Sequence, residues 1–142
     1  MKPVHPIVVL ITDSKKIEHR LTQILKKDYG FNLKITPTAR EGLAALYTAR
    51  HTPVLVLIDD KVQDLSISEF CQSLRKSHIT EELPICIISS LEDEAVIRTL
   101  FETSRTYHLS KPVHDHDVVD TITDILQHYV FFEKMLQKVA NQ

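Results

Sequence analysis

The chain has 142 residues, 43% of them hydrophobic, which is enough for one domain with a sizeable core and too few for two. Its 17 basic and 19 acidic side chains give a net charge of −2. This balance argues against a general nucleic-acid surface, because binding to phosphates requires a basic excess or a basic face. The apolar run 7–11 is too short for a signal peptide or a membrane span. We therefore expect a single-domain protein of the cytoplasm.

The cysteines and glycines exclude further classes of protein. Cys71 and Cys86 lack CxxC spacing, so neither a disulfide framework nor a zinc site is predicted, and both side chains are expected in the core. The only glycines are Gly30 and Gly42. A nucleotide-binding Rossmann or flavodoxin-like domain is excluded, because no glycine-rich phosphate loop is available.

The N-terminal part of the chain predicts two strand–helix pairs. Residues 7–11 form an apolar β-branched run, which predicts the first strand, and a helix is expected over 15–29, where Gly30 ends it. Residues 31–35 alternate between apolar and polar, as in a strand near a sheet edge. A second helix is predicted over 38–50. Its residues expected to face inward are Leu43, Ala44, Leu46 and Tyr47.

The middle of the chain continues this alternation. Residues 53–60, PVLVLIDD, form a short apolar run ending at two carboxylates, which predicts a strand buried on both faces. A helix is expected over 65–78 and another buried strand over 84–88. The next helix is predicted over 91–103, and 106–109 is a weaker strand candidate. The 91–103 helix carries the apolar residues Ala95, Val96, Leu100 and Phe101, among others.

The last predicted helix runs from about Asp115 to Ala140, a length of ~39 Å at ~1.5 Å per residue. Its apolar residues form a heptad-like seam, which exceeds what a small sheet can cover. Two interpretations stay open: a dimerisation or signal-carrying helix, or a terminal helix folded back on its own domain. We expect a domain over 1–127, a helical extension over 128–142, and no attached DNA-binding or enzymatic output domain. The seam residues are Val118, Ile122, Ile125, Tyr129, Phe132, Leu136 and Val139.

The strict alternation of strands and helices predicts an α/β fold, a doubly wound sheet of five parallel strands in the order 2-1-3-4-5. In that order the carboxyl ends of the strands converge on one edge, and polar residues stand at those ends. Carboxylates there favour a hard cation such as Mg²⁺, while a lysine and a hydroxyl suit a phosphoryl group. One aspartate is then a candidate nucleophile. The residues concerned are Asp13, Asp59, Asp60, Ser89 and Lys111.

These residues resemble the receiver domains of two-component response regulators, which are CheY-like, over about residues 7–126. The segment 53–59, PVLVLID, resembles the family's PDLVLLD, and 84–90, PICIISS, resembles its PIIMLTA. ITD at 11–13 resembles the family's acidic pair, LSKP at 109–112 its LTKP, and the glycine-led segment 42–46 its G-x-x-A-L.

The resemblance implies a phosphorylation-dependent signalling switch. Asp59 would accept a phosphoryl group from a histidine kinase or a phosphotransfer protein, with Lys111 pairing with the phosphate. Asp13, Asp59 and the backbone carbonyl of Lys61 would hold Mg²⁺. Ser89 would donate its hydroxyl to the acyl phosphate, and His108 occupies the family's aromatic switch position. At most the chain would catalyse its own phosphotransfer and dephosphorylation, and a downstream effector protein would read the signal.

Two departures from the family pattern keep an alternative open. Thr12 replaces the first acid of the pair, so Mg²⁺ should bind weakly. The loop 62–67 lacks the Pro and Gly of the family's M-P-x-M-D-G, which leaves its geometry undetermined. The alternative is a pseudo-receiver, a phosphorylation-independent interaction module that docks through its fourth and fifth helices.

Other acidic and histidine residues receive structural interpretations. Strand alternation points Asp60 away from Asp59, so we expect an exposed loop acid rather than a second metal ligand. The run 114–117, HDHD, looks like a metal tract. It falls where a helix begins, and acids that cap the helix are the better interpretation.

Overall fold

The computed structural model describes residues 6–49 and 53–140, with side chains as far as residue 128. Five strands form one sheet in the order β2-β1-β3-β4-β5, and every pair is parallel. This confirms the predicted fold class. The strands are β1 Ile7–Ile11, β2 Asn32–Thr36, β3 Leu55–Asp59, β4 Ile85–Ser89 and β5 Thr106–Ser110.

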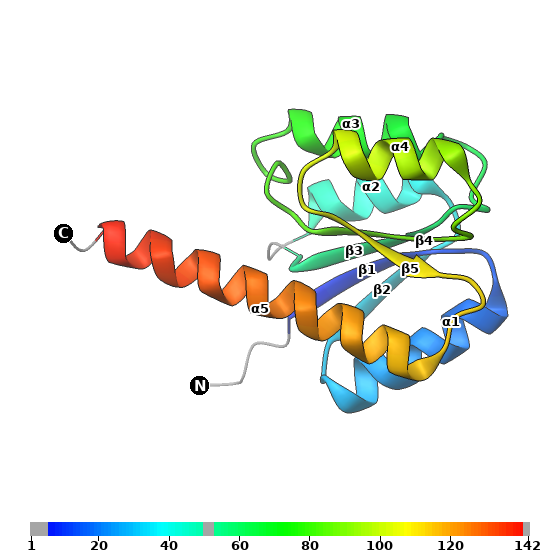
Figure 1. The fold of residues 1–142 in the computed structure, drawn as a ribbon, viewed down its shortest axis with the longest axis horizontal. Coiled ribbons are helices and arrows are strands. Elements are labelled where there is room, and N and C mark those ends of the chain that lie inside the picture. The colour runs from blue at the N-terminus through cyan, green and yellow to red at the C-terminus, as the bar shows by residue number, and fades with distance from the viewer. Residues whose placement is uncertain (1–5, 50–52, 141–142) are drawn as a thin grey trace.

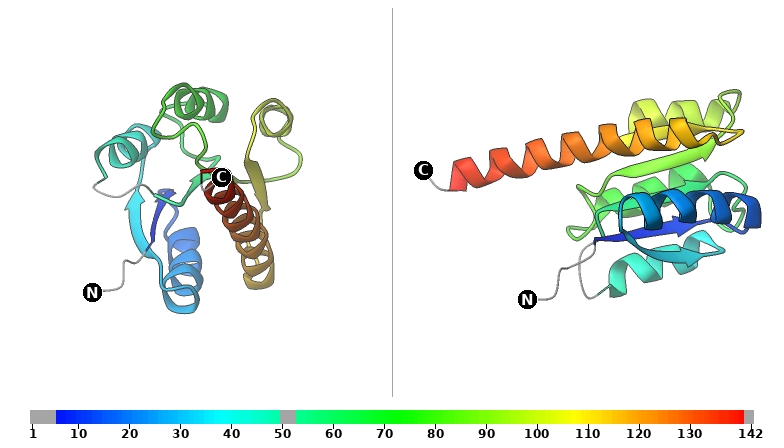
Figure 2. Two further views of the ribbon diagram at one scale, coloured as in Figure 1. Left: turned by 90° about the vertical axis from the view of Figure 1, so that its left-hand side faces the viewer. Right: turned by 90° about the horizontal axis from the view of Figure 1, so that it is seen from below.

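Helices cover both faces of the sheet. The helices α1 and α5 lie on one face, and α2, α3 and α4 lie on the other (Figures 1 and 2). The helix α1 continues into a π-helical segment, η1 (Gln23–Asp28), and Gly30 follows it with a positive φ of 69°. The helices are α1 Lys15–Thr22, α2 Ala39–Thr48, α3 Ile67–Lys76, α4 Glu94–Glu102 and α5 Asp115–Ala140.

The core has two layers, one on each side of the sheet. Alternate residues of the central strands supply both layers, which is why all five residues of β3 and of β4 are buried. One layer includes Leu25 of η1 and Ile122 of α5, and the other includes Leu46 of α2 and Phe70 of α3. The sheet is therefore held from both sides, and its carboxyl edge is fixed in place.

The inward face of α2 differs from the prediction. Ala44 and Tyr47 are exposed, whereas Gly42 and Leu46 are buried. A Cβ atom at position 42 would lie 2.2 Å from Ile11 Cδ1, so a larger residue would fit between α2 and β1 only if the buried Ile11 side chain moved. The prediction counted apolar side chains, and here a close helix–sheet contact is made by a residue with no side chain.

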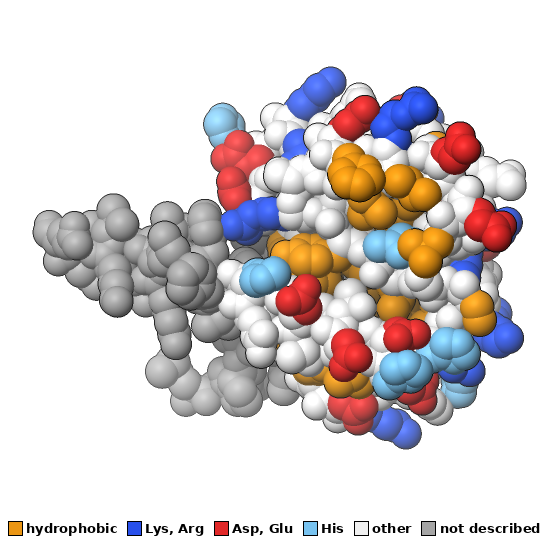
Figure 3. Space-filling view, in the orientation of Figure 1, with side chains coloured by type: hydrophobic (Ala, Val, Ile, Leu, Met, Phe, Trp, Pro, Cys, Tyr) orange, Lys and Arg blue, Asp and Glu red, His pale blue; other side chains and the backbone are white. Residues whose placement is uncertain are grey.

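The apolar residues of α4 are divided between the surface and the core. Phe101 is 87% exposed and Ala95 is exposed, while Val96 and Thr99 are buried. The Thr99 hydroxyl donates to the Ala95 carbonyl at 2.9 Å, so burial leaves no unpaired polar group there. Hydrophobic side chains accordingly reach the surface over α4 (Figure 3).

The first half of the long terminal helix packs on the sheet. Val118, Ile122 and Ile125 are buried in the core, and the helix then extends past the sheet (Figure 1). Four seam residues, Tyr129, Phe132, Leu136 and Val139, lie outside the described side chains. Within the described part of the chain, none of the helices combines the length and apolar character needed to cross a bilayer.

Candidate functional site

Asp59 ends β3 and is fully buried, with 0% of its surface exposed. Its Oδ1 accepts hydrogen bonds from Lys111 Nζ at 2.6 Å and from the Lys61 backbone N–H at 3.1 Å. Its Oδ2 accepts from the Thr12 hydroxyl at 2.8 Å. Both carboxylate oxygens are thus engaged by donors from three different segments.

These donors keep the Asp59 carboxylate ionised. Burial raises its pKa, but hydrogen bonds from the Lys111 side chain, the Lys61 backbone and the Thr12 hydroxyl outweigh burial, and the pKa is lowered overall. Asp59 is therefore a buried carboxylate that carries its negative charge at neutral pH.

Lys111 joins two carboxylates. Its Nζ donates to Asp59 Oδ1 and to Asp60 Oδ1, each at 2.6 Å. Burial lowers the pKa of Lys111, whereas its hydrogen bonds to the two carboxylates raise it, and the net shift is upward. The amine stays charged and balances one of the two negative charges.

The prediction for Asp60 was wrong, because its side chain is only 13% exposed and contacts Lys111. Residue 60 lies in a turn just after β3 rather than within the strand. The alternation of side chains between two faces holds only for extended backbone, so it did not apply there. Asp60 thus belongs to the site, as its place at the end of β3 indicated, and is not the exposed loop acid that strand alternation predicted.

Ser89 and His108 contact each other rather than Asp59. Ser89 is buried at the end of β4, and its Oγ lies 2.9 Å from His108 Nε2 and 3.1 Å from the Ser90 carbonyl oxygen. With the hydroxyl hydrogen donated to that carbonyl, His108 Nε2–H is the donor to Ser89. Burial lowers the pKa of His108, and the Ser89 backbone and the charge of Asp60 oppose this only in part. The side chain at the switch position is thus tied to the hydroxyl at the end of the neighbouring strand.

Asp13 and Lys61 lie on the other side of Asp59. Asp13 follows β1 and is exposed. With Lys61 it lines a hollow of about 360 Å³ between the ends of β1 and β3. Two carboxylates and a backbone carbonyl are oxygen donors of the kind that Mg²⁺ prefers, and Mg²⁺ keeps several waters when protein ligands are few. Among the described residues no group of three or more His, Cys, Asp or Glu side chains forms a metal cluster. The predicted magnesium ligands are thus divided between this hollow, which Asp13 and Lys61 line, and the buried Asp59, and the magnesium site stays a prediction.

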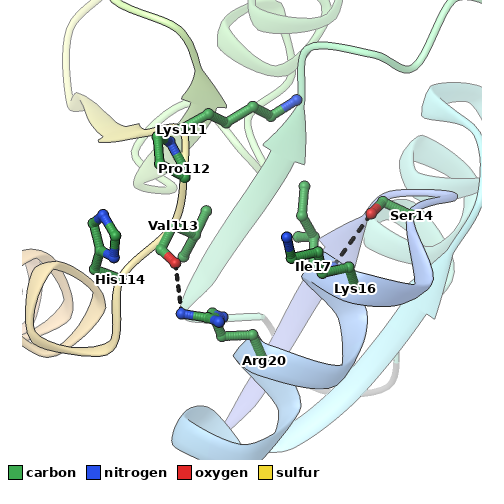
Figure 4. Close-up of a pocket in the computed structure, with 8 residues that line it drawn as sticks. All are labelled: Ser14, Lys16, Ile17, Arg20, Lys111, Pro112, Val113 and His114. Atoms are coloured by element: carbon green, nitrogen blue, oxygen red, sulfur yellow. Dashed lines mark hydrogen bonds between the residues drawn. The ribbon is translucent and has the colours of Figure 1, made fainter.

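A second hollow, of about 370 Å³, lies between the start of α1 and the connection from β5 to α5 (Figure 4). Arg20 closes its base by donating to the Val113 carbonyl oxygen at 2.8 Å. Three further nitrogen-bearing side chains, Lys16, Lys111 and His114, line it. This side of the site is basic, in contrast to the side that carries Asp13.

The other residues that the sequence singled out, two acids and two cysteines, have structural roles. Asp115 and Asp117 lie in the first turn of α5, where negative charge is favourable. Cys71 and Cys86 are buried and free, and burial raises their pKa values to about 11 and about 12. Both thiols are protonated core side chains, as predicted.

Comparisons with known proteins agree with this geometry. A family model described as the response regulator receiver domain matches residues 8–123. Hybrid signal transduction histidine kinase D of Dictyostelium discoideum is 22% identical over 122 residues, a match that covers 85% of this chain and 8% of that protein. The chain therefore spans only a small part of this relative.

Solved structures of similar shape cover most of the chain. The chemotaxis response regulator CheY4 of Vibrio cholerae has a TM-score of 0.75 at 20% identity, covering 86% of this chain and 99% of that one. A response regulator receiver domain protein from Clostridium thermocellum has a TM-score of 0.77 at 21% identity, covering 89% and 98%. At these identities the likeness supports the fold.

Proposed function

Because the chain belongs to the response regulator receiver domain family, we propose that it is a phosphorylation-dependent signalling switch whose phosphoacceptor is Asp59. The observation that carries this proposal is the hydrogen bond of 2.6 Å between Lys111 Nζ and Asp59 Oδ1. It sets a permanent cation beside a buried, ionised nucleophile at the carboxyl edge of a parallel sheet.

In the proposed reaction, an oxygen of Asp59 attacks the phosphorus of a phosphohistidine on a histidine kinase or a phosphotransfer protein. A new P–O bond forms, and the P–N bond breaks with its electron pair left on the imidazole, which takes up a proton. The product is an acyl phosphate. Lys111 then pairs with the phosphoryl oxygens, and the Ser89 hydroxyl donates to them in place of the Ser90 carbonyl oxygen.

Magnesium would neutralise charge on the phosphoryl group when it is bound. Asp13, Asp59 and the Lys61 backbone carbonyl are the proposed ligands. Thr12 contributes a hydroxyl where the family has a carboxylate, so we propose weak binding. The chain itself would catalyse no reaction other than its own phosphotransfer and dephosphorylation.

The signal would pass to an effector protein at the surface around α4. Phe101 of α4 is 87% exposed and Leu91, just before α4, is 63% exposed. Hydrophobic side chains reach the surface over α4 (Figure 3), and exposed apolar side chains suit a contact with another protein. We further propose a homodimer through the extension of α5, on the basis of the heptad-like seam in the sequence, and a cytoplasmic location.

A second candidate is a pseudo-receiver that binds its partner without phosphorylation. Two observations favour it: Thr12 occupies an acid position, and Asp59 has 0% of its surface exposed. A phosphoryl donor reaches such a carboxylate only if Thr12 or Lys111 moves.

Incubation with acetyl phosphate and Mg²⁺ separates the two functions. A hydroxylamine-labile adduct detected by intact mass supports the switch, and Asp59→Asn should abolish it. Labelling that survives this substitution would assign the acceptor to Asp60. An unlabelled wild-type chain, including with a histidine kinase as donor, would establish the docking module instead.

A further inference from the structure

The loop between β3 and α3 is tied to a helix that is distant in the sequence. Asp64 accepts hydrogen bonds from the backbone N–H groups of Ala39 and Arg40, one on each carboxylate oxygen and both at 2.9 Å. These residues begin α2, and the first N–H groups of a helix have no partner within it. The Arg40 guanidinium also lies 3.9 Å from Asp64 Oδ2. One side chain therefore holds the loop to α2.

The same loop carries groups that touch the phosphoacceptor. The Lys61 N–H donates to Asp59 Oδ1, and the Val62 N–H donates to the Asp59 carbonyl oxygen at 3.2 Å. The Val62 side chain is 6% exposed. The loop is consequently fixed at two places, at Asp59 where it begins and at Asp64 three residues beyond Lys61.

Asp64 adds to a cap that α2 already has, and unlike that cap it comes from another loop. The helix α2 already has a cap from its own sequence, because the Thr38 hydroxyl accepts the Glu41 N–H at 3.1 Å. Burial raises the pKa of Asp64, but hydrogen bonds from the Arg40 and Ala39 backbones lower it, and the net shift is downward. Asp64 is therefore a charged second anchor at this helix end.

The loop needs such an anchor because it lacks the Pro and Gly found in the family pattern. Proline restricts the backbone of a loop directly, and here Val62, Gln63 and Asp64 leave the backbone free to rotate. The hollow between Asp13 and Lys61 is also lined by Gln63 and Asp64. The position of the loop residues that line this hollow therefore depends on where the loop is anchored.

We propose that Asp64 is a positioning residue for the phosphoacceptor site. Its hydrogen bonds to the start of α2 fix the position of the Lys61 backbone, and thereby the position of the loop residues that line the hollow beside Asp13. The expected effect of Asp64 on Mg²⁺ binding rests on the proposed function. Its expected effect on the loop does not depend on phosphorylation.

The test compares Asp64→Ala and Asp64→Asn with a matched control, Asp93→Ala. Asp93 also accepts two helix N–H groups, those of Ala95 and Val96, at 3.1 and 3.2 Å. Its removal costs α4 the same kind of cap and leaves the loop after β3 untouched. Two readouts are needed: amide hydrogen exchange, and the Mg²⁺ concentration that gives half-maximal labelling by acetyl phosphate.

We expect Asp64→Ala to speed exchange at Lys61 and Val62 as well as at Ala39 and Arg40. The half-maximal Mg²⁺ concentration should rise about tenfold, a typical effect of losing a group that orients metal ligands. Asp64→Asn, which keeps one acceptor oxygen, should have a smaller effect. Asp93→Ala should change neither the exchange at Lys61 and Val62 nor the half-maximal Mg²⁺ concentration.

Faster exchange confined to Ala39 and Arg40 would overturn the proposal, since Asp64 would then be only a helix cap. An unchanged Mg²⁺ requirement in both Asp64 variants would also overturn it. If the wild-type chain is not labelled at all, the proposed function fails, and exchange at Lys61 and Val62 alone decides whether Asp64 positions the loop. Asp64→Asn keeps the test available if Asp64→Ala does not fold.

Discussion

The Thr12 hydroxyl donates to Asp59 Oδ2 over 2.8 Å, so a neutral side chain from the end of β1 satisfies the carboxylate at the end of β3. Thr12 itself is only 3% exposed. A neutral donor stabilises Asp59 without a metal, whereas a second carboxylate would repel it unless a cation lay between them. The residue at position 12 therefore decides how strongly the site depends on Mg²⁺.

Thr12→Asp is expected to tighten Mg²⁺ binding by about tenfold, because each added carboxylate raises affinity for a hard cation. Without Mg²⁺ the same variant should lose about 2 kcal/mol of stability through repulsion between two buried carboxylates. Urea unfolding with and without Mg²⁺ measures both effects. Thr12→Asn is the neutral control, and equal behaviour of the two variants would show that charge at this position is irrelevant.

Lys111 balances Asp59 and Asp60, so its removal leaves two neighbouring carboxylates without a cation. We expect Lys111→Met to lose about 2 kcal/mol at neutral pH, less than for a fully buried pair because the amine is 22% exposed. Part of the loss should be recovered in acid as the carboxylates protonate. Lys34→Met, on the exposed side of β2, is the control for loss of a surface charge. A Lys111 variant that matches this control would show that the pairing contributes nothing to stability.

The lowered pKa of Asp59 makes part of the stability depend on pH. A carboxyl whose pKa is lower in the folded state stabilises the fold above its ordinary value of 3.8 and loses that contribution as the pH falls through the folded value. The difference in unfolding free energy between the wild type and Asp59→Asn should therefore shrink as the pH is taken from 6 to below 3.8. Urea titrations across this range measure it. A difference that stays constant would mean that ionisation of Asp59 does not contribute.

Phe101 offers a reporter for the switch. The chain contains four tyrosines and no tryptophan, so Phe101→Trp introduces a single tryptophan, on α4, whose emission can be excited selectively. Because residue 101 is exposed, the variant should keep its stability within about 0.5 kcal/mol. Emission should shift on phosphorylation by acetyl phosphate and stay unchanged when Asp59→Asn is added. A spectrum that is the same before and after labelling would place the conformational response away from α4.

The sequence predicted the sheet well, because the signals for strands were local. Apolar β-branched runs such as 7–11 and 84–88 ended at turn residues, and the alternation with helices then dictated parallel order. The convergence of Asp59 and Lys111 followed from that order alone, since both residues stand at the carboxyl ends of strands.

What the sequence could not predict depends on contacts between distant segments or on backbone geometry. Asp60 lies in a turn, where the alternation rule fails, and its contact with Lys111 is a property of two chain segments. The bonds from Asp64 to the start of α2 span 24 and 25 residues with no motif to mark them. On α4 the apolar Phe101 is exposed and the polar Thr99 is buried, an arrangement that residue type alone does not indicate.

The proposed homodimer through the extension of α5 can be tested by removing that extension. Val118, Ile122 and Ile125, the buried residues in the part of this helix whose side chains are described, pack in the core of the domain. We therefore expect a chain ending at 127 to keep its free energy of unfolding to within about 1 kcal/mol. Sedimentation equilibrium should show a concentration-dependent dimer for the full chain and a monomer for the shorter one. Phe132→Glu, which charges the heptad-like seam of the sequence, should give a monomer without shortening the helix. A full chain that stays monomeric at high concentration would remove the dimer and leave the extension as a single signal-carrying helix.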